Sequence, residues 1–360
     1  MTTEPLFAHL VAMTDETGLF EHALFDAPRI EHGYCVDDVA RGLIVLTRAA
    51  SEPGSDGRLG QLAWRYLRFL ALSQAPDGGV VNRCDVDGVR HGDFTVEDCW
   101  GRALWGLGTA AARSRDDQLA EWALARFELS AGRRSPWPKA MAFAGLGAAE
   151  VLRVHSGHQA ARALLADAAL AVGRPGPDPA WPWPQPRLSY ANAVIPDVLL
   201  AAGDYLNDAG LRDDGLLLLG WLLDVETAGD HLSVTPSGGW GPAESRPGFD
   251  QQPIEVAALA DACARAYELT GDPRWSQGVE RATAWFHGAN DLGLPLLDPA
   301  TGGCRDGLER NGRNENQGAE STLALISTLQ HSERLLPPHR SAERPGPAHR
   351  SAERLLPARP

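Results

Sequence analysis

The chain has 360 residues and carries 33 basic against 47 acidic side chains, a formal net charge of −14. A protein that binds nucleic acid needs a concentrated basic surface, so this charge argues against that class of partner. No apolar run reaches the roughly 18 residues of a membrane-spanning helix, and the first residues lack the basic start of a secretory signal. We therefore expect a cytoplasmic globular protein without a nucleic-acid or membrane partner. Its oligomeric state stays open.

The cysteines indicate neither a disulfide framework nor a metal centre. There are five, an odd number, and no two stand in the C-x-x-C spacing of zinc or redox motifs. The sequence also shows no cluster of histidine and cysteine ligands of the kind that holds zinc. We expect reduced, partly buried thiols and a site that uses neither a metal nor a cofactor.

Over residues 1–331 the chain repeats one pattern: a helix rich in glycine and alanine, a short link, a helix striped with leucine and tryptophan, and a longer loop. The small-residue helices begin near Asp37, Glu97, Lys139, Tyr190, Pro253 and Gln317. Each of the first five precedes an amphipathic helix, such as RLGQLAWRYLRFLAL, whose apolar side chains recur at helical spacing. The sixth lacks a following partner, and a helix over residues 5–14 would supply it.

Helix pairs that recur every 42 to 64 residues predict an all-α repeat protein, and no stretch shows the alternation of a sheet. We expect six pairs to close into an (α/α)6 toroid over residues 1–331, one barrel domain. Small residues would let six inner helices converge, and the amphipathic helices would cover them. An open α-solenoid is the alternative, but the N-terminal helix that completes the count favours closure.

The last stretch, residues 332–360, differs in composition. It reads SERLLPPHRSAERPGPAHRSAERLLPARP, repeats HRSAER and ERLLP, and is dominated by proline and arginine. Such a segment has too few apolar side chains to close a core, so we expect a disordered tail.

In a closed toroid, the long connections and the N-termini of all inner helices meet at one end, where function is concentrated. The long connections here are residues 74–95, 131–138, 173–189, 227–252 and 290–316. Acidic residues stand at or near the same helix starts: Asp37, Asp38, Glu97, Asp98, Glu255, Glu315 and Glu320. We expect these carboxylates to converge on one cavity, where mutual repulsion raises the pKa of some of them.

Each acid also has a purely structural interpretation. Acidic side chains in a first helical turn stabilise the helix dipole, and Asp37–Arg41 and Asp98–Arg102 stand at the i,i+4 spacing of intrahelical ion pairs. For any single acid this interpretation stays open. For all of them together, convergence on a cavity explains the pattern better.

The loops between these helices are rich in tryptophan and amide side chains. Aromatic faces stack on the C–H faces of sugar rings, while amides, carboxylates and arginines bind the hydroxyls, so the mixture is typical of a carbohydrate site. An alternative for the two loop tryptophans is that they wedge the loops onto the barrel rim. The candidate substrate-binding residues are Asp37, Glu97, Arg102, Trp183, Tyr190, Asn192, Trp240, Asp250, Gln251, Gln252, Glu315, Asn316 and Gln317.

Six stretches within residues 20–329 carry a specific resemblance. They are HGYCVDDVARGLI, VEDCWGRALWGLG, LSYANAVIPDVLLAAGDYL, FDQQPIEVAALADA, TGGCRDGL and ENQGAESTLALI. Together they resemble a bacterial glycosidase-like, glycosyltransferase-associated group of the six-hairpin glycosidase superfamily. The resemblance implies an (α/α)6 fold and a role in carbohydrate metabolism, but it supplies no agreed catalytic pair.

Glycoside cleavage needs one protonated carboxyl, which gives its proton to the leaving oxygen, and one carboxylate, which activates water or attacks. We expect a glycoside hydrolase that acts on an oligosaccharide or polysaccharide. From their positions at the helix starts, Glu255 or Glu320 would be the general acid, and Asp38 or Asp98 the base.

Three other functions stay open. A sugar epimerase or isomerase on the same toroid needs a base with a pKa near neutral, most simply histidine, and the expected mouth offers only His32, His91 and His231. A terpene cyclase of the D-x-D-D type is disfavoured, because Cys35 stands where the first aspartate would be. A carbohydrate-binding protein without catalysis would use the same tryptophans and amides.

Overall fold

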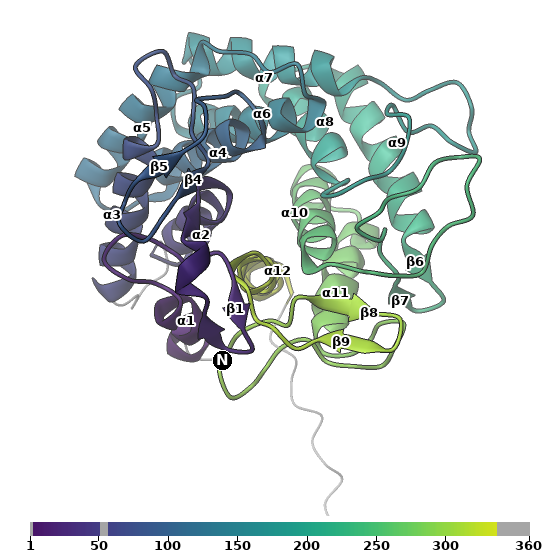
Figure 1. The fold of residues 1–360 in the computed structure, drawn as a ribbon. Coiled ribbons are helices and arrows are strands. Elements are labelled where there is room, and N and C mark those ends of the chain that lie inside the picture. Colours follow the sequence, from purple (N-terminus) through teal and green to yellow (C-terminus); the bar gives the residue numbers. More distant parts are fainter. Residues whose placement is uncertain (1–2, 51–56, 337–360) are drawn as a thin grey trace, which may run out of the picture.

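The computed structural model describes residues 3–50 and 57–336, and within them twelve α-helices form two concentric rings (Figure 1). The inner helices are α2 (Val36–Ala50), α4 (Asp98–Arg113), α6 (Pro138–Val154), α8 (Val194–Tyr205), α10 (Pro253–Thr270) and α12 (Ala319–Leu335). The outer helices are α1 (Thr3–Ala12), α3 (Gly57–Leu72), α5 (Asp117–Ala131), α7 (Gln159–Val172), α9 (Ala209–Val225) and α11 (Pro273–Phe286).

The inner ring is closed. Each inner helix packs against the next one, and α12 packs against both α10 and α2. The N-terminal helix α1 packs against α12 and completes the sixth pair, as the sequence predicts. The (α/α)6 toroid is therefore confirmed and the open solenoid is excluded. Helix α12 continues to Leu335, so the first residues of the expected tail belong to it, while residues 337–360 lie outside the described residues.

Connections differ sharply between the two ends of the toroid. Links from an inner to its outer helix are short, such as residues 114–116 and 271–272, whereas the returns to the next inner helix are long, such as residues 226–252. The long loops thus meet the N-termini of the inner helices at one end, as predicted. Helix α8 begins four residues later than expected from Tyr190, because Ala191 takes a positive φ of 44° in the turn before it.

Short antiparallel strands brace the loops. One hairpin pairs β1 (Ala23–Leu24) with β2 (Ala27–Pro28), and a three-stranded sheet joins β3 (Tyr34–Cys35), β4 (Arg83–Cys84) and β5 (Arg90–His91). Two more hairpins pair β6 (Thr227–Ala228) with β7 (His231–Leu232) and β8 (Gly307–Glu309) with β9 (Gly312–Asn314). The sequence did not predict these strands, because two or three residues are too few to show an alternating pattern.

Small residues set the distance between inner helices. Gly108 on α4 faces Gly147 on α6, and a Cβ built at Gly108 would overlap the backbone carbonyl of Gly147. Glycine is required here for the close approach of two backbones, which is the role that the glycine-rich pattern predicts for the inner ring.

Gly108→Ala is expected to lower the free energy of unfolding by about 1–3 kcal/mol, because the added methyl pushes α4 and α6 apart. Gly60→Ala on the outer helix α3 is the matched control, since its Cβ meets open space. That variant should gain about 0.5–1 kcal/mol from the higher helix propensity of alanine. Chemical denaturation compares the two, and equal stabilities would show that the inner ring has spare room.

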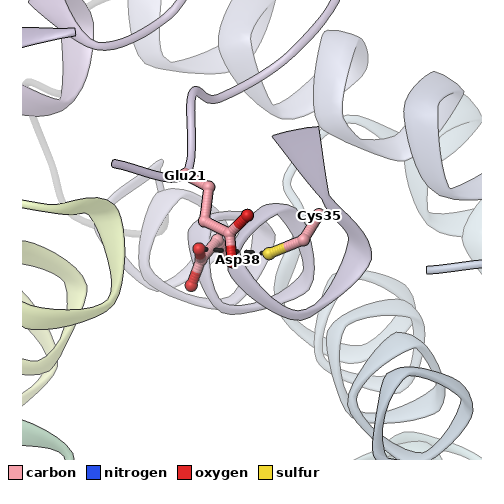
Figure 2. Close-up of side chains that lie close together, drawn as sticks. All are labelled: Glu21, Cys35 and Asp38. Atoms are coloured by element: carbon pink, nitrogen blue, oxygen red, sulfur yellow. Dashed lines mark hydrogen bonds between the residues drawn. The ribbon is translucent and has the colours of Figure 1, made fainter. Parts of the chain in front are cut away.

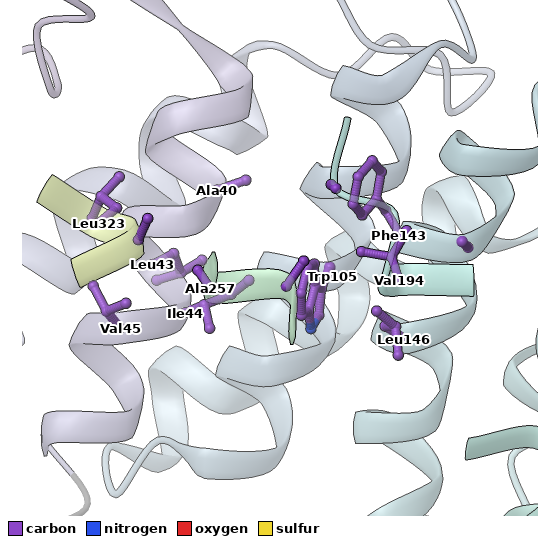
Figure 3. Packing of buried hydrophobic residues seen from close by; sticks show 14 of the residues in the cluster. Ala40, Leu43, Ile44, Val45, Trp105, Phe143, Leu146, Val194, Ala257 and Leu323 are labelled. Carbon is purple, nitrogen blue, oxygen red and sulfur yellow. The ribbon is translucent and has the colours of Figure 1, made fainter. Parts of the chain in front are cut away.

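Side chains fill the barrel axis below its loop-bearing end. Figure 3 shows residues from all six inner helices pointing toward one another, among them Trp105 and Phe143, whose rings stack with centroids 6.0 Å apart. In the described part of the chain, an apolar cavity of about 40 Å³ remains there. Arg41 and Arg102 line both this small cavity and a much larger one above it. The two arginines therefore separate an apolar barrel interior from a polar mouth.

All five cysteines are buried with free thiols. No helix in the described ranges combines the length and apolarity that a bilayer crossing demands.

Candidate active site

A cavity of about 520 Å³, here called the mouth cavity, opens where the inner helices begin. First turns of α2, α4 and α12 contribute to its wall, together with the loops before α8, α10 and α12. Acidic helix starts from three inner helices therefore converge on one space. The lining side chains are Glu21, His22, Cys35, Asp37, Asp38, Arg41, Asp98, Arg102, Tyr190, Ser237, Asp250, Gln251, Gln252, Asp306, Leu308, Glu309, Asn314, Glu320 and Ser321.

Arg41 joins two of the cavity's carboxylates. Its Nη1 donates to Oδ1 of Asp38 at 2.6 Å, and its Nη2 donates to Oε2 of Glu320 at 2.6 Å. The intrahelical pair with Asp37, which the capping interpretation required, is not among the ion pairs of the described residues. One guanidinium thus connects the start of α2 to the start of α12 across the closure of the ring.

Asp38 is the most deeply buried of the cavity's acids and is 3% exposed. Burial raises its pKa to about 7, and the nearby Glu320 charge adds to this effect against the attraction of Arg41. The Cys35 thiol donates to its second oxygen, with sulfur and oxygen 3.1 Å apart. A carboxyl that titrates near neutral pH can both hold and release a proton there, which is what general acid catalysis requires.

Arg102 pairs with the neighbouring helix α2 instead of along its own helix. Its Nε lies 3.3 Å from Oδ1 of Asp37, and its guanidinium lies over the Phe143 ring at 3.9 Å from the centroid. The i,i+4 partner expected for it, Asp98, accepts a hydrogen bond of 2.6 Å from the Tyr190 hydroxyl. Asp98 is therefore a partly exposed carboxylate, oriented by a tyrosine, in the wall of the mouth cavity.

Glu255 does not line the mouth cavity, although it was expected as a general acid. It is 3% exposed, and its carboxylate accepts hydrogen bonds from the backbone N–H groups of Ala191 and Asn192 and from Nδ2 of Asn192. Asn192 is itself fully buried, so neither residue can reach a ligand in the cavity. Both hold the turn before α8, which positions Tyr190.

A buried charge pair accompanies this turn. Burial lowers the pKa of the Lys139 ammonium, although Glu255 opposes the shift. Burial also raises the pKa of Glu255 and of the neighbouring Glu226. Because Glu226 and Glu255 are enclosed, their raised pKa values reflect burial in the protein interior.

Three residues before α12 that were predicted to bind substrate instead form hydrogen bonds within the loops. Glu315 is held by the guanidinium groups of Arg305 and Arg313. Asn316 accepts a hydrogen bond of 2.9 Å from a backbone N–H of the β1–β2 hairpin, and Gln317 is buried with both ends of its amide hydrogen-bonded. None of the three lines the mouth cavity.

The two loop tryptophans also have structural roles. Trp183 is 3% exposed and stacks on Trp221 of α9 with centroids 5.9 Å apart. Trp240 meets Trp181 edge to face at 5.0 Å. Neither ring lines the mouth cavity, and their contacts fit the alternative that they wedge their loops onto the barrel rim. Trp183 contacts α9 directly, and Trp240 does so through Trp181.

The structure adds polar residues that sequence reasoning missed, among them Glu21, His22 and Asp306. Glu21 and His22 come from the loop before β1, where no motif marks them, and Asp306 stands inside the stretch TGGCRDGL without an assigned role. Asp306 accepts a hydrogen bond of 2.8 Å from the backbone N–H of Gly318, and burial raises its pKa.

The histidine that lines the mouth cavity is not one of the three that the sequence predicted there. His22 lines the cavity and meets His32 edge to face, with centroids 5.1 Å apart. His91 and His231 instead bind Asp85 and Asp291 at 2.7 and 2.9 Å. Of these four histidines, only His22 lines the mouth cavity in the described part of the chain.

Glu21, Cys35 and Asp38 form the one group in the described part of the chain with potential metal-ligand atoms close together, within 4.8 Å (Figure 2). Arg41 already pairs with Asp38, and Arg83 pairs with Glu21. Burial and the Asp38 charge raise the pKa of the Cys35 thiol, whereas a metal binds the thiolate. The group is thus satisfied by ion pairs and hydrogen bonds and fits a metal poorly.

No family model and no curated protein matches the chain, but solved structures do. A sugar epimerase from a ruminal bacterium has a TM-score of 0.68 at 14% identity, over 92% of this chain and 97% of that one. The cellobiose 2-epimerase of Bacillus thermoamylovorans has a TM-score of 0.69 at 12% identity, over 91% of this chain and 95% of that one. A glycoside hydrolase family 76 α-mannanase of Bacteroides thetaiotaomicron has a TM-score of 0.60 at 10% identity, over 92% of this chain and 95% of that one.

The chain shares the (α/α)6 toroid fold of these solved structures. The expectation from the sequence resemblance is confirmed at this level. Identities this low show the fold alone, and one fold can carry several reactions. The choice of reaction therefore depends on the mouth cavity.

Proposed function

We propose that the chain is a carbohydrate-active enzyme, a glycoside hydrolase that uses carboxylate acid/base catalysis on an oligosaccharide or polysaccharide. The observation that carries this proposal is the mouth cavity, where Asp38, Asp98 and Glu320 from three helix starts meet above Arg41 and Arg102. Similar folds in solved carbohydrate-processing enzymes support it.

Asp38 is the proton donor in this proposal. Its pKa of about 7 keeps a large share of it protonated at neutral pH, so it can give its proton to the leaving glycosidic oxygen. Asp98, held by Tyr190, takes a proton from the attacking water. One water is thereby added across the bond. Asp38 then regains a proton from solvent, and Asp98 releases to solvent the proton that it took. This assignment moves Asp38 from the expected base to the acid, because its burial favours the protonated form.

Other cavity residues bind and orient. Glu320 shares Arg41 with Asp38, so it acts on the donor through that guanidinium. Arg102 and Asp37 offer a hydrogen-bond donor and acceptor on the cavity wall, and Asp250 and Gln252 approach from the loop before α10. Such convergent polar groups satisfy sugar hydroxyls.

A screen of α- and β-linked gluco- and manno-oligosaccharides, with detection of new reducing ends, tests the proposed function. Hydrolysis in ¹⁸O-labelled water should place the label in the new reducing end. Products with rearranged stereochemistry but unchanged chain length would contradict hydrolysis.

The dependence of kcat on pH is a second expected result. Because Asp38 must be protonated, kcat should fall about tenfold per pH unit above about 7. Glu320→Gln removes a negative charge that raises the Asp38 pKa, so the alkaline limb should move to lower pH. Steady-state rates across pH measure both, and a limb that stays in place or moves to higher pH would argue against Asp38 as the acid.

A sugar epimerase is the second candidate, because His22 lines the mouth cavity and two of the similar structures are named as epimerases. In that reaction a base removes the proton beside the sugar carbonyl, a step that an imidazole side chain can perform. Incubation of reducing disaccharides in D₂O would place deuterium at C2. Absence of deuterium beside measurable hydrolysis would exclude this candidate.

A further inference from the structure

A second cavity of about 450 Å³, here called the side cavity, lies beside the mouth cavity. Its walls come from the starts of α4 and α6 and from the loop before α8. Asp98 and Tyr190 line both cavities, so the two spaces are neighbours across the hydrogen bond that joins these residues. A ligand longer than one sugar ring can therefore occupy both and place a linkage beside Asp98.

Trp137 is the distinguishing side chain of the side cavity. It is 57% exposed, whereas all the other tryptophans of the chain, every one of them in the described part, are buried or partly buried. It stands at the N-cap of α6, where its side chain makes no capping hydrogen bond. A large aromatic face left open in a cavity marks a contact surface for a ligand.

Polar side chains surround this aromatic face. Glu97 is exposed, is the N-cap of α4, makes no capping hydrogen bond and lines the side cavity. Gln185, Arg187 and Ser189 line the opposite side. An aromatic face with acids, amides and a guanidinium around it fits the alternating apolar faces and hydroxyl edges of a pyranose ring.

The boundary between the cavities is rigid. The Lys139 ammonium lies 4.3 Å from the centroid of the Tyr190 ring and 3.5 Å from Oδ1 of Asn192. Tyr190 donates its hydroxyl to Asp98 at the same time. Tyr190 is thus held both at its ring face and at its hydroxyl. A sugar chain that crosses from one cavity to the other passes this fixed side chain.

We propose that the side cavity is a second sugar-binding subsite with Trp137 as its stacking platform, and that the substrate is an oligosaccharide chain spanning both cavities. This inference rests on the proposed function and names its substrate class. The subsite takes a neutral hexose ring, whose hydroxyls meet Glu97 and Arg187 while its C–H face covers Trp137.

The experiment compares oligosaccharides, from disaccharides to hexasaccharides, with the matching nitrophenyl monosaccharide glycosides. Trp137→Ala should raise KM for the oligosaccharides about tenfold with kcat nearly unchanged, and should leave KM for the monosaccharide glycosides unchanged. Trp137→Phe should recover most of the affinity, because an aromatic face is restored. Phe94→Ala is the matched control, since Phe94 is also exposed but lines neither cavity.

Binding of the same sugars, followed by titration calorimetry, separates the two proposals. Oligosaccharide cleavage with the same KM in Trp137→Ala and wild type would overturn the subsite and leave the hydrolase. Trp137-dependent binding without cleavage would overturn the hydrolase and leave the subsite. A protein that binds no member of the panel would overturn both.

Discussion

Asp38→Asn is expected to lower kcat on natural oligosaccharides by about 10²–10⁴-fold, because the amide cannot give a proton to the leaving oxygen. The loss should depend on the leaving group. A dinitrophenyl glycoside expels a weakly basic phenolate that needs no protonation, so its hydrolysis should lose far less. Steady-state kinetics with both kinds of substrate measures the difference.

Two variants make this result interpretable. Asp87→Asn is the control, since Asp87 is exposed on the β4–β5 turn and lines neither cavity. Asp98→Asn should slow both kinds of substrate alike, because activation of water does not depend on the leaving group. Equal losses for both substrates in Asp38→Asn would assign the donor role to another residue.

Asp261→Asn should lower the free energy of unfolding by about 3–5 kcal/mol, the usual cost of leaving a buried charge without its partner. Asp261 on α10 accepts from Arg48 of α2 at 3.2 Å and from His331 of α12. Its side chain is 11% exposed. The residue therefore ties together the three inner helices at which the ring closes, far from the mouth cavity.

The pH dependence of this effect follows from the direction of its pKa shift. Burial alone would raise the Asp261 pKa, but Arg48 and His331 outweigh it and hold the pKa well below the usual range. The stabilisation is thus complete above the unfolded-state pKa of about 4 and fades as the pH falls below it. Asp224→Asn, which removes a solvent-exposed pair with Arg274, should cost about 0–1 kcal/mol. Similar costs for the two variants in urea denaturation would contradict this role.

The closed ring of helices could be predicted because the residues that produce it form local patterns in the sequence. Glycine and alanine recur where two backbones touch, as at Gly108 and Gly147, and apolar stripes mark the covering helices. The acidic starts of α2, α4 and α12 could be predicted for the same reason, since a closed ring brings all inner N-termini to one end.

The direction of single side chains could not be predicted. Glu255 and Glu320 both stand in the first turn of their helices, yet Glu255 turns toward the backbone of Ala191, which has a left-handed conformation. Only the packing of α8 against α10 decides this. Trp183 and Trp240 are the residue type that stacks on sugars, but Trp183 packs against Trp221 and Trp240 against Trp181. Such contacts join distant parts of the chain, so the local sequence does not show them.

The most direct test of the central claim is a crystal structure of Asp98→Asn with a bound oligosaccharide. We predict sugar in the mouth cavity, with a glycosidic oxygen within hydrogen-bond distance of the Asp38 carboxyl and the next ring over Trp137. Sugar bound at any other surface, with the mouth cavity filled by solvent, would contradict the account.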